Sequence, residues 1–292
     1  MTLKEILKKA ADEKWSTGHF NISELDHMRT VAEACAELRA PAIIGTSEGE
    51  RKHIGLREAV AVRDVLRKEF DVPIFLNADH TKSVVAAKEA IDAGFDSVHI
   101  DLSELLFEEN VLGTCETVEY AKQHSNILQN VGMSIEGEVG YLRGESKIQK
   151  EKIKIKKEDY TKPEEAKEFV ERTGVDRLAI VIGNIHGLSP EEPVLDIDLI
   201  GRIRRICPAE VALVLHGGSG IPDEQIVNAI KVGISNIHVN TDLRKAFVEG
   251  LKESLEENPE EVAMYKLDKE GIERMKEVIK QKLTLFGSVN QV

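Results

Sequence analysis

Apolar and β-branched residues gather in eight short runs along the chain, and longer segments with a helical spacing of apolar positions separate these runs. Most runs are continuously apolar rather than alternating, which is typical of parallel strands that are covered on both faces. The eight runs are residues 18–23, 41–47, 73–79, 97–103, 134–140, 177–184, 212–218 and 236–242. Between them, for example at 24–39 and 56–70, apolar residues recur every three or four positions, as on one face of a helix.

Eight strands that alternate with helices predict an α/β protein with the (β/α)8 TIM-barrel fold. The alternative is an open doubly wound sheet, which carries a G-x-G-x-x-G turn after its first strand. No such turn follows residues 18–23, so we favour the barrel. Residues 1–15 and 268–286 have helical patterns outside the eight repeats and predict additional terminal helices. No linker or low-complexity tract divides residues 1–292, so we expect a single domain.

A lysine-rich insert, residues 141–162, follows the fifth predicted strand. One interpretation is a solvated loop or hairpin. The other is a mobile active-site loop, because loops at the carboxyl ends of barrel strands often close over a substrate.

The charge balance excludes some classes of partner. The chain has 39 Lys and Arg against 52 Asp and Glu, a formal net charge of −13, which argues against a nucleic-acid or anionic-membrane surface. No apolar run approaches the roughly 20 residues of a membrane span, and the first 15 residues form a mixed-charge pattern unlike a secretory signal. We therefore expect a cytoplasmic protein. Cys35, Cys115 and Cys207 are widely spaced and predict neither a disulfide framework nor a zinc knot.

Three histidines stand at the ends of predicted strands: His80, His186 and His216. In a barrel the carboxyl ends of the strands meet on one face, which carries the active site. Three imidazoles on that face can bind Zn²⁺ and leave its fourth position open, as in catalytic zinc sites. The alternative is three independent hydrogen-bonded histidines, but packing does not require imidazoles at three matching positions.

Acidic residues accompany these histidines. Asp79 adjoins His80 and is placed for proton transfer to a substrate hydroxyl, although it or Thr81 could instead cap the helix that follows. Asp101, Glu136 and Glu138 end the fourth and fifth strands, where they could hold a second cation or form a hydrogen-bonding network.

Two turns predict anion binding. Residues 216–226, HGGSGIPDEQI, form a glycine-rich turn that leads into a helix, and residues 238–247, HVNTDLRKAF, form a second. Free backbone N–H groups and the helix dipole favour a phosphate at such turns. Arg244 can clamp another phosphate, and Ser47 places a hydroxyl on the same face of the barrel. An acidic protein can thus contain a locally positive site.

These motifs resemble the class II, metal-dependent ketose-bisphosphate aldolases, which include the fructose-bisphosphate and tagatose-bisphosphate enzymes. The resemblance extends over nearly the whole chain. It rests on PAIIGTSEG, LNADH, VHIDLSE, EGEVG, YTKPEEAKEFVERTGVDRLA, GNIHG, LVLHGGSGIPDEQI and VNTDLRKAF, which occur in the family's order.

The resemblance implies a role for each matching residue. It implies Zn²⁺ on His80, His186 and His216, with Asp79 as the catalytic acid and base. A second divalent metal would use Asp101 and Glu138, and a monovalent cation often assists in this family. The residues that match those holding dihydroxyacetone phosphate are Gly187, Gly217, Gly218, Ser219, His238, Val239, Asn240 and Thr241. Ser47 and Arg244 match the hold on the second phosphate, and Asn21 matches an asparagine beside the enediolate.

The chain departs from the family pattern at several positions. The family usually has lysine and asparagine in the eighth strand, where this chain has Asn236 and His238. Its usual G-T-S-H-G is replaced by residues 183–187, GNIHG. Its loop usually carries G-G-x-E-D, whose glutamate moves a proton of dihydroxyacetone phosphate. Ser146 occupies that glutamate's place here, and Glu145, one residue earlier, is the candidate for its role.

The implied function is a fructose-1,6-bisphosphate aldolase of glycolysis and gluconeogenesis that forms dihydroxyacetone phosphate and glyceraldehyde 3-phosphate, assembled as a homodimer or homotetramer. Asn240 favours fructose over the alternative, tagatose 1,6-bisphosphate. More remote alternatives are a barrel metallohydrolase and a non-catalytic sugar-phosphate-binding barrel. A Schiff-base mechanism requires a desolvated lysine within a strand, and the predicted strand cores contain none.

Overall fold

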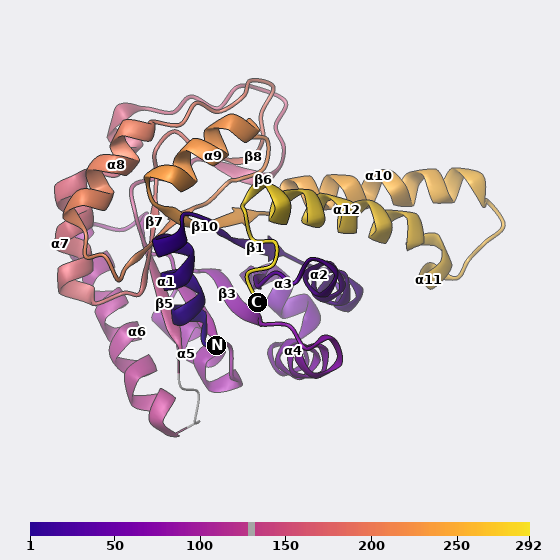
Figure 1. The fold of residues 1–292 in the computed structure, drawn as a ribbon, viewed down its shortest axis with the longest axis horizontal. Coiled ribbons are helices and arrows are strands. Elements are labelled where there is room, and N and C mark those ends of the chain that lie inside the picture. The colour runs from indigo at the N-terminus through magenta and orange to yellow at the C-terminus, as the bar shows by residue number, and fades with distance from the viewer. Residues whose placement is uncertain (128–131) are drawn as a thin grey trace.

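Parallel strands close into a barrel in the order β1-β10-β9-β7-β5-β4-β3-β2 in the computed structural model, which describes residues 1–127 and 132–292 (Figure 1). Each barrel strand overlaps one predicted apolar run, so the predicted TIM-barrel fold is confirmed. The barrel strands are β1 Thr17–Asn21, β2 Ala42–Thr46, β3 Ile74–Thr81, β4 Ser97–Ile100, β5 Ser134–Val139, β7 Arg177–Ile180, β9 Ala212–Leu215 and β10 Ile234–Val239.

Helices follow the strands and cover the outside of the barrel. Helix α5 ends at Gly94 and helix α9 ends at Gly233, because these glycines adopt φ values of +97° and +133° that other residues rarely adopt. The helices are α1 Leu3–Glu13, α2 Leu25–Leu38, α3 Glu48–Ile54, α4 Leu56–Phe70, α5 Val84–Ala93, α6 Phe107–Ile127, α7 Pro163–Thr173, α8 Ile197–Ile206, α9 Asp223–Val232, α10 Thr241–Glu257, α11 Met264–Leu267 and α12 Lys269–Leu285, with a 3-10 turn at Lys157–Asp159. Among the described residues, no helix combines the length and the apolar character of a membrane span.

The predicted terminal helices are present at both ends of the chain. The apolar face of α1 packs with Ile43, Phe75 and Ala212, which lie near the amino ends of their strands, so α1 covers the bottom of the barrel. At the other end of the chain, α10 and α12 run side by side away from the barrel (Figure 1). Lys276 of α12 forms an ion pair with Glu37 of α2 at 2.6 Å, which fastens α12 to the outer helices.

The insert at 141–162 contains a strand, β6 Gly144–Ile148, that pairs in parallel with β8 His186–Leu188. The backbone N–H of His186 donates to the carbonyl of Arg143 at 2.8 Å, and that of Gln149 donates to Leu188 at 2.7 Å. The sequence was compatible with a solvated loop, a hairpin or a mobile active-site loop, and it did not predict this small sheet. The insert is thereby joined to the segment that carries His186.

Gly187 makes the close approach of β6 and β8 possible. Its φ is +90°, and a Cβ atom there would lie 2.4 Å from the carbonyl oxygens of Glu145 and Lys147. We expect Gly187→Ala to lower the free energy of unfolding by about 1–3 kcal/mol and to expose the insert to protease. Chemical denaturation and limited proteolysis measure both effects.

Gly49→Ala is the matched control, because a Cβ atom at this helical position would have nothing within 4 Å. Alanine there should be neutral or stabilising by up to about 1 kcal/mol. Equal stability and equal protease resistance in both variants would contradict a packing role for Gly187.

Candidate metal centre and active site

The three histidines predicted from strand ends converge at the carboxyl end of the barrel. His80 lies near the end of β3, His186 begins β8, and His216 follows β9 directly. The ring centroid of His80 lies 4.7 Å from that of His186 and 4.7 Å from that of His216, and the other two rings are 6.2 Å apart. Residues separated by 136 positions thus share one point in space.

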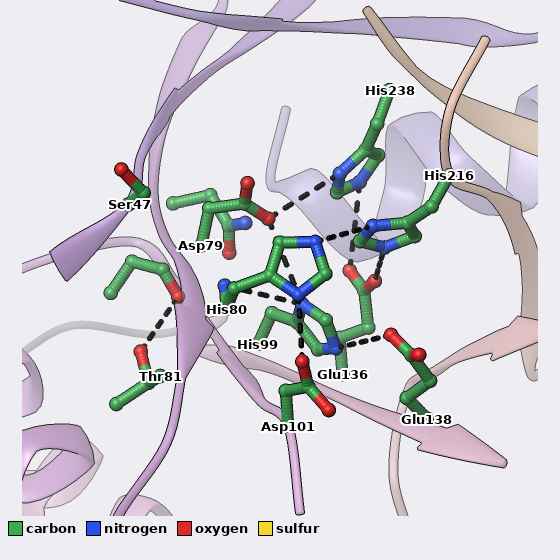
Figure 2. Close-up of polar contacts among 12 residues, drawn as sticks. Ser47, Asp79, His80, Thr81, His99, Asp101, Glu136, Glu138, His216 and His238 are labelled. Carbon is green, nitrogen blue, oxygen red and sulfur yellow. Dashed lines mark hydrogen bonds and ion pairs between the residues drawn. The ribbon is translucent and has the colours of Figure 1, made fainter. Parts of the chain in front are cut away.

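Carboxylates orient two of these rings (Figure 2). Asp101 Oδ2 lies 2.8 Å from Nδ1 of His80, and Glu136 Oε1 lies 2.7 Å from Nε2 of His216. The remaining nitrogens, Nε2 of His80 and Nδ1 of His216, face each other at 3.0 Å. When the outer nitrogens donate to carboxylates, both facing nitrogens present lone pairs, which is the arrangement of carboxylate–histidine–metal sites. Possible ligand atoms of Asp79, His80, His99 and His216 lie within 4.8 Å of one another, so this donor set fits a divalent cation such as Zn²⁺, and the ring of His186 lies beside that of His80.

Asp79 lies beside this centre and is 3% exposed. Its Oδ2 accepts a hydrogen bond from Asn21 Nδ2 at 2.9 Å, and its Oδ1 lies 3.4 Å from Nδ1 of His238. Burial raises the pKa of Asp79, but the charge that His80 has when it is protonated and the hydrogen bond of His238 outweigh burial and hold this pKa well below its usual range. The carboxylate is therefore ionised at neutral pH, as a proton acceptor must be.

The alternative role for Asp79, helix capping, is wrong. The hydroxyl of Ser83 caps α5 by accepting from the N–H of Ala86 at 3.2 Å. Thr81 does not cap α5 either, because its hydroxyl donates to the carbonyl of Ala78 and accepts from Arg51.

Further histidines surround Asp79: His19 and His99, together with His238, which the resemblance matched to substrate binding. His19 and His238 stack with their ring centroids 3.5 Å apart. His99 lies between Asp79 and Glu138, with its Nε2 3.4 Å from Glu138 Oε2. Burial lowers the pKa of His99, but the charge of Glu136 and the contacts to Asp79 and Glu138 raise it well above its usual range.

The predicted second cation position, Asp101 and Glu138, already contains a cationic side chain. Lys82 Nζ lies 2.7 Å from Asp101 Oδ2, the same oxygen that contacts His80. Ser103 Oγ donates to Asp101 at 2.7 Å and contacts Glu138 at 3.4 Å. Possible ligand atoms of His80, His99, Asp101 and Glu138 lie within 4.8 Å of one another, so the geometry permits a cation there in competition with Lys82.

Arg177 is a buried residue of the site that the sequence analysis did not single out. It stands opposite Glu136 in the β5–β7 register, and its Nη1 lies 2.7 Å from Glu136 Oε2. The same guanidinium donates to Asn77 at 3.0 Å and to Asn236, at the position of the family's usual lysine, at 3.2 Å. Arg177 thus fixes the carboxylate that orients His216. The sequence signal that could have identified Arg177 was its charge at the start of an apolar run.

A cavity of about 160 Å³ adjoins the histidines. It is lined by Asn21, Ser47, Asp79, His80, Ser146, His186, Gly187, His216, Gly217, Ser219, His238, Asn240, Thr241 and Arg244. Most residues predicted to bind substrate are thus brought together. Two lie behind the wall instead: Gly218, whose N–H donates to the carbonyl of His238 at 2.8 Å, and Val239, which is buried.

One end of this cavity has the features of a phosphate site. Gly217 has φ +64°, and a Cβ atom there would lie 1.9 Å from the carbonyl oxygen of Ile185. The 17-residue helix α10 begins at Thr241, and Ser219 Oγ accepts from the N–H of Asp242 at 3.1 Å. The Oδ1 of Asn240 is buried without a hydrogen-bond partner among the described residues. A helix N-terminus beside a close-packed glycine turn favours an anion.

Another part of the cavity lining contains Ser47 and Arg244, the residues matched to a second phosphate. A buried carboxylate, Glu50, contacts both of them and Asn21. The sequence analysis did not identify Glu50, because its position in the first turn of α3 also suits an ordinary helix-capping residue.

Glu145 is not brought into the site. Its side chain is 74% exposed, and its carboxylate lies 2.8 Å from Lys147 Nζ. Ser146 lines the cavity in its place, and the Ser146 carbonyl accepts from Arg244 at 3.3 Å.

A larger cavity of about 600 Å³ lies near the amino ends of the strands, beside Thr2, Val72, Asp96 and Gly132. It is at the opposite end of the barrel from the histidines. Catalysis in TIM barrels takes place at the carboxyl ends, so the smaller cavity is the candidate active site.

The barrel and its histidine centre agree with the comparison to known families. The sequence profile described as Fructose-bisphosphate aldolase class-II matches residues 1–291. The chain belongs to this family of aldolases.

Individual relatives cover almost the whole chain. A fructose-bisphosphate aldolase of Geobacillus stearothermophilus is 37% identical over 291 residues, 99% of this chain and 97% of that protein. A sulfofructosephosphate aldolase of Alkalicoccus urumqiensis is 34% identical over 290 residues, 99% of this chain and 96% of that protein. The crystal structure of the YdjI aldolase from Escherichia coli K12 superimposes with a TM-score of 0.79 at 29% identity, covering 99% of this chain and 98% of that one.

Proposed function

We propose that this protein catalyses the metal-dependent, reversible aldol cleavage of a ketose that carries a phosphate on C1, releasing dihydroxyacetone phosphate and an aldehyde. The observation that supports this best is the pair of facing nitrogens of His80 and His216 at 3.0 Å, beside the ionised Asp79. Fructose 1,6-bisphosphate, with tagatose 1,6-bisphosphate as its alternative, is the substrate of this type predicted from the sequence.

His80, His186 and His216 would hold the metal, with Asp101 and Glu136 fixing the tautomers of His80 and His216. A divalent ion bound there would polarise the ketone carbonyl of the substrate. Cys35, Cys115 and Cys207 take no part, since each lies on an outer helix or just after one.

Asp79 would remove the proton of the C4 hydroxyl during cleavage and return it during condensation. Asn21 and His238 contact the two oxygens of its carboxylate and so fix its orientation. His238 and Asn21 also line the cavity, so they hold Asp79 on the side where the substrate would bind.

The C1 phosphate would bind at the glycine turn 217–219 and the N-terminus of α10. Anchoring a phosphate away from the reacting bond orients the C3–C4 bond toward Asp79. Glu145, which faces solvent, would serve as the proton donor to dihydroxyacetone phosphate only after β6 turns its side chain inward.

The proposed function is tested by a coupled assay. The metal-loaded protein is incubated with fructose 1,6-bisphosphate, tagatose 1,6-bisphosphate or fructose 1-phosphate, and dihydroxyacetone phosphate is measured with a reductase and NADH. We expect its release from at least one of these ketoses. Release of inorganic phosphate without any triose phosphate would instead identify a metallohydrolase and refute the proposal.

A further inference from the structure

A buried carboxylate lies behind the part of the cavity where a second phosphate was expected. Glu50 is 5% exposed and lies directly behind the cavity wall. Its Oε2 accepts from the backbone N–H of Ser47 at 2.6 Å and lies 3.3 Å from Asn21 Nδ2, and its Oε1 forms an ion pair with Arg244 Nη2. Each residue that Glu50 contacts also lines the cavity.

The N–H of Ser47 and two N–H groups of Arg244 at this distal end are therefore already engaged. The N–H of Ser47, which a phosphate oxygen could use, donates to Glu50. Arg244 uses Nη2 for Glu50 and Nη1 for the carbonyl of Ser146, 3.3 Å away. The charge of Arg244 is balanced before any substrate binds.

From these contacts we propose that Glu50 makes the distal end of the site selective for an uncharged group, so that the natural substrate is a ketose 1-phosphate with a free terminal hydroxyl rather than a bisphosphate. This inference rests on the proposed aldolase function. The aldehyde half of the reaction would then be an unphosphorylated hydroxyaldehyde.

Electrostatics gives the physical reason. A terminal phosphate on Arg244 would bring a dianion close to a buried carboxylate, and like charges at close range weaken binding strongly. It would also have to displace Glu50 from Arg244 and leave that carboxylate buried without its cation. A hydroxyl adds no charge and can exchange hydrogen bonds with the hydroxyl of Ser47 and the guanidinium of Arg244.

The C1 end of the cavity differs in this respect. Asp242, the acidic residue in the first turn of α10, directs its carboxylate to Lys282 at 3.1 Å, while its N–H donates to Ser219. The N-terminus of α10 faces the cavity there. Among the described residues, no buried carboxylate contacts it in the way that Glu50 contacts Arg244. The two ends thus differ in charge, and a substrate with one phosphate matches this difference.

The test measures condensation of dihydroxyacetone phosphate with glyceraldehyde, both enantiomers, and with glyceraldehyde 3-phosphate. We expect the wild-type protein to have the higher kcat/KM with glyceraldehyde. Glu50→Gln removes the charge and keeps an amide oxygen for the N–H of Ser47. It should raise kcat/KM for glyceraldehyde 3-phosphate by at least about tenfold and change that for glyceraldehyde by less than about threefold.

Glu48→Gln is the matched control, because it makes the same charge change on the same helix at an exposed position. It should leave the ratio of the two kcat/KM values unchanged. Calorimetry measures binding without turnover. In an Asp79→Asn background, Glu50→Gln should increase the affinity for fructose 1,6-bisphosphate relative to that for fructose 1-phosphate by a similar factor.

The inference is overturned if the wild-type protein prefers glyceraldehyde 3-phosphate, or if Glu50→Gln leaves the ratio unchanged. Failure of the proposed function looks different. In that case the metal-loaded wild-type protein forms no carbon–carbon bond with either aldehyde.

Discussion

Replacing Asp79 by alanine should lower kcat for aldol cleavage by about 10²–10⁴-fold while the bound metal stays near one ion per chain. The reason is that Asp79 is the ionised carboxylate in the cavity wall, whereas in the proposed site His80, His186 and His216 would hold the metal. Coupled kinetics and elemental analysis of the same preparation measure the two quantities.

Alanine at this position leaves Asn21 and His238 without their partner, so Asp79→Asn is the companion variant. Asparagine keeps an acceptor for Asn21 but cannot take a proton. Both variants should lose activity to a similar extent. Cleavage within tenfold of wild type in Asp79→Asn would show that another group moves the proton.

Removal of the metal with a strong chelator should lower cleavage by roughly a thousandfold or more, and a divalent cation such as Zn²⁺ should restore it. Borohydride added together with substrate should leave activity intact, because a Schiff-base enzyme needs a lysine with a lowered pKa. Lys82 is the lysine beside the site, and although burial lowers its pKa, Asp101 raises that pKa above the usual value.

Lys82 is therefore a protonated ion-pair partner and not a nucleophile. Activity that survives chelation but is lost to borohydride with substrate would refute the metal mechanism. The same elemental analysis also tests the second cation position, since occupation of Asp101 by Lys82 favours one bound ion over two.

The barrel and its main centre could be predicted because both depend on local patterns. Continuous apolar runs mark the strands, and a polar residue where a run stops must lie on the rim of the barrel. His80, His186 and His216 satisfy this rule, and the structure brings them together. The glycine turn at 217–219 was equally readable, since its backbone conformation requires glycine.

The other contacts of the site could not be predicted, because they depend on which residues the barrel places opposite each other. Arg177 and Glu136 are 41 positions apart, and the register of β5 against β7 makes them partners. Glu50 resembles a helix cap until the fold brings Arg244 beside it. Likewise β6 joins β8 through backbone hydrogen bonds, which side-chain patterns do not encode.

The pairing of β6 with β8 has a thermodynamic consequence. In the proposed site His186 would offer its ring to the metal, while its backbone N–H donates to Arg143, so one residue would take part in two binding equilibria. Linkage then requires reciprocity: an ion that holds the imidazole strengthens the attachment of the insert, and detaching the insert weakens the hold on the ion to the same degree.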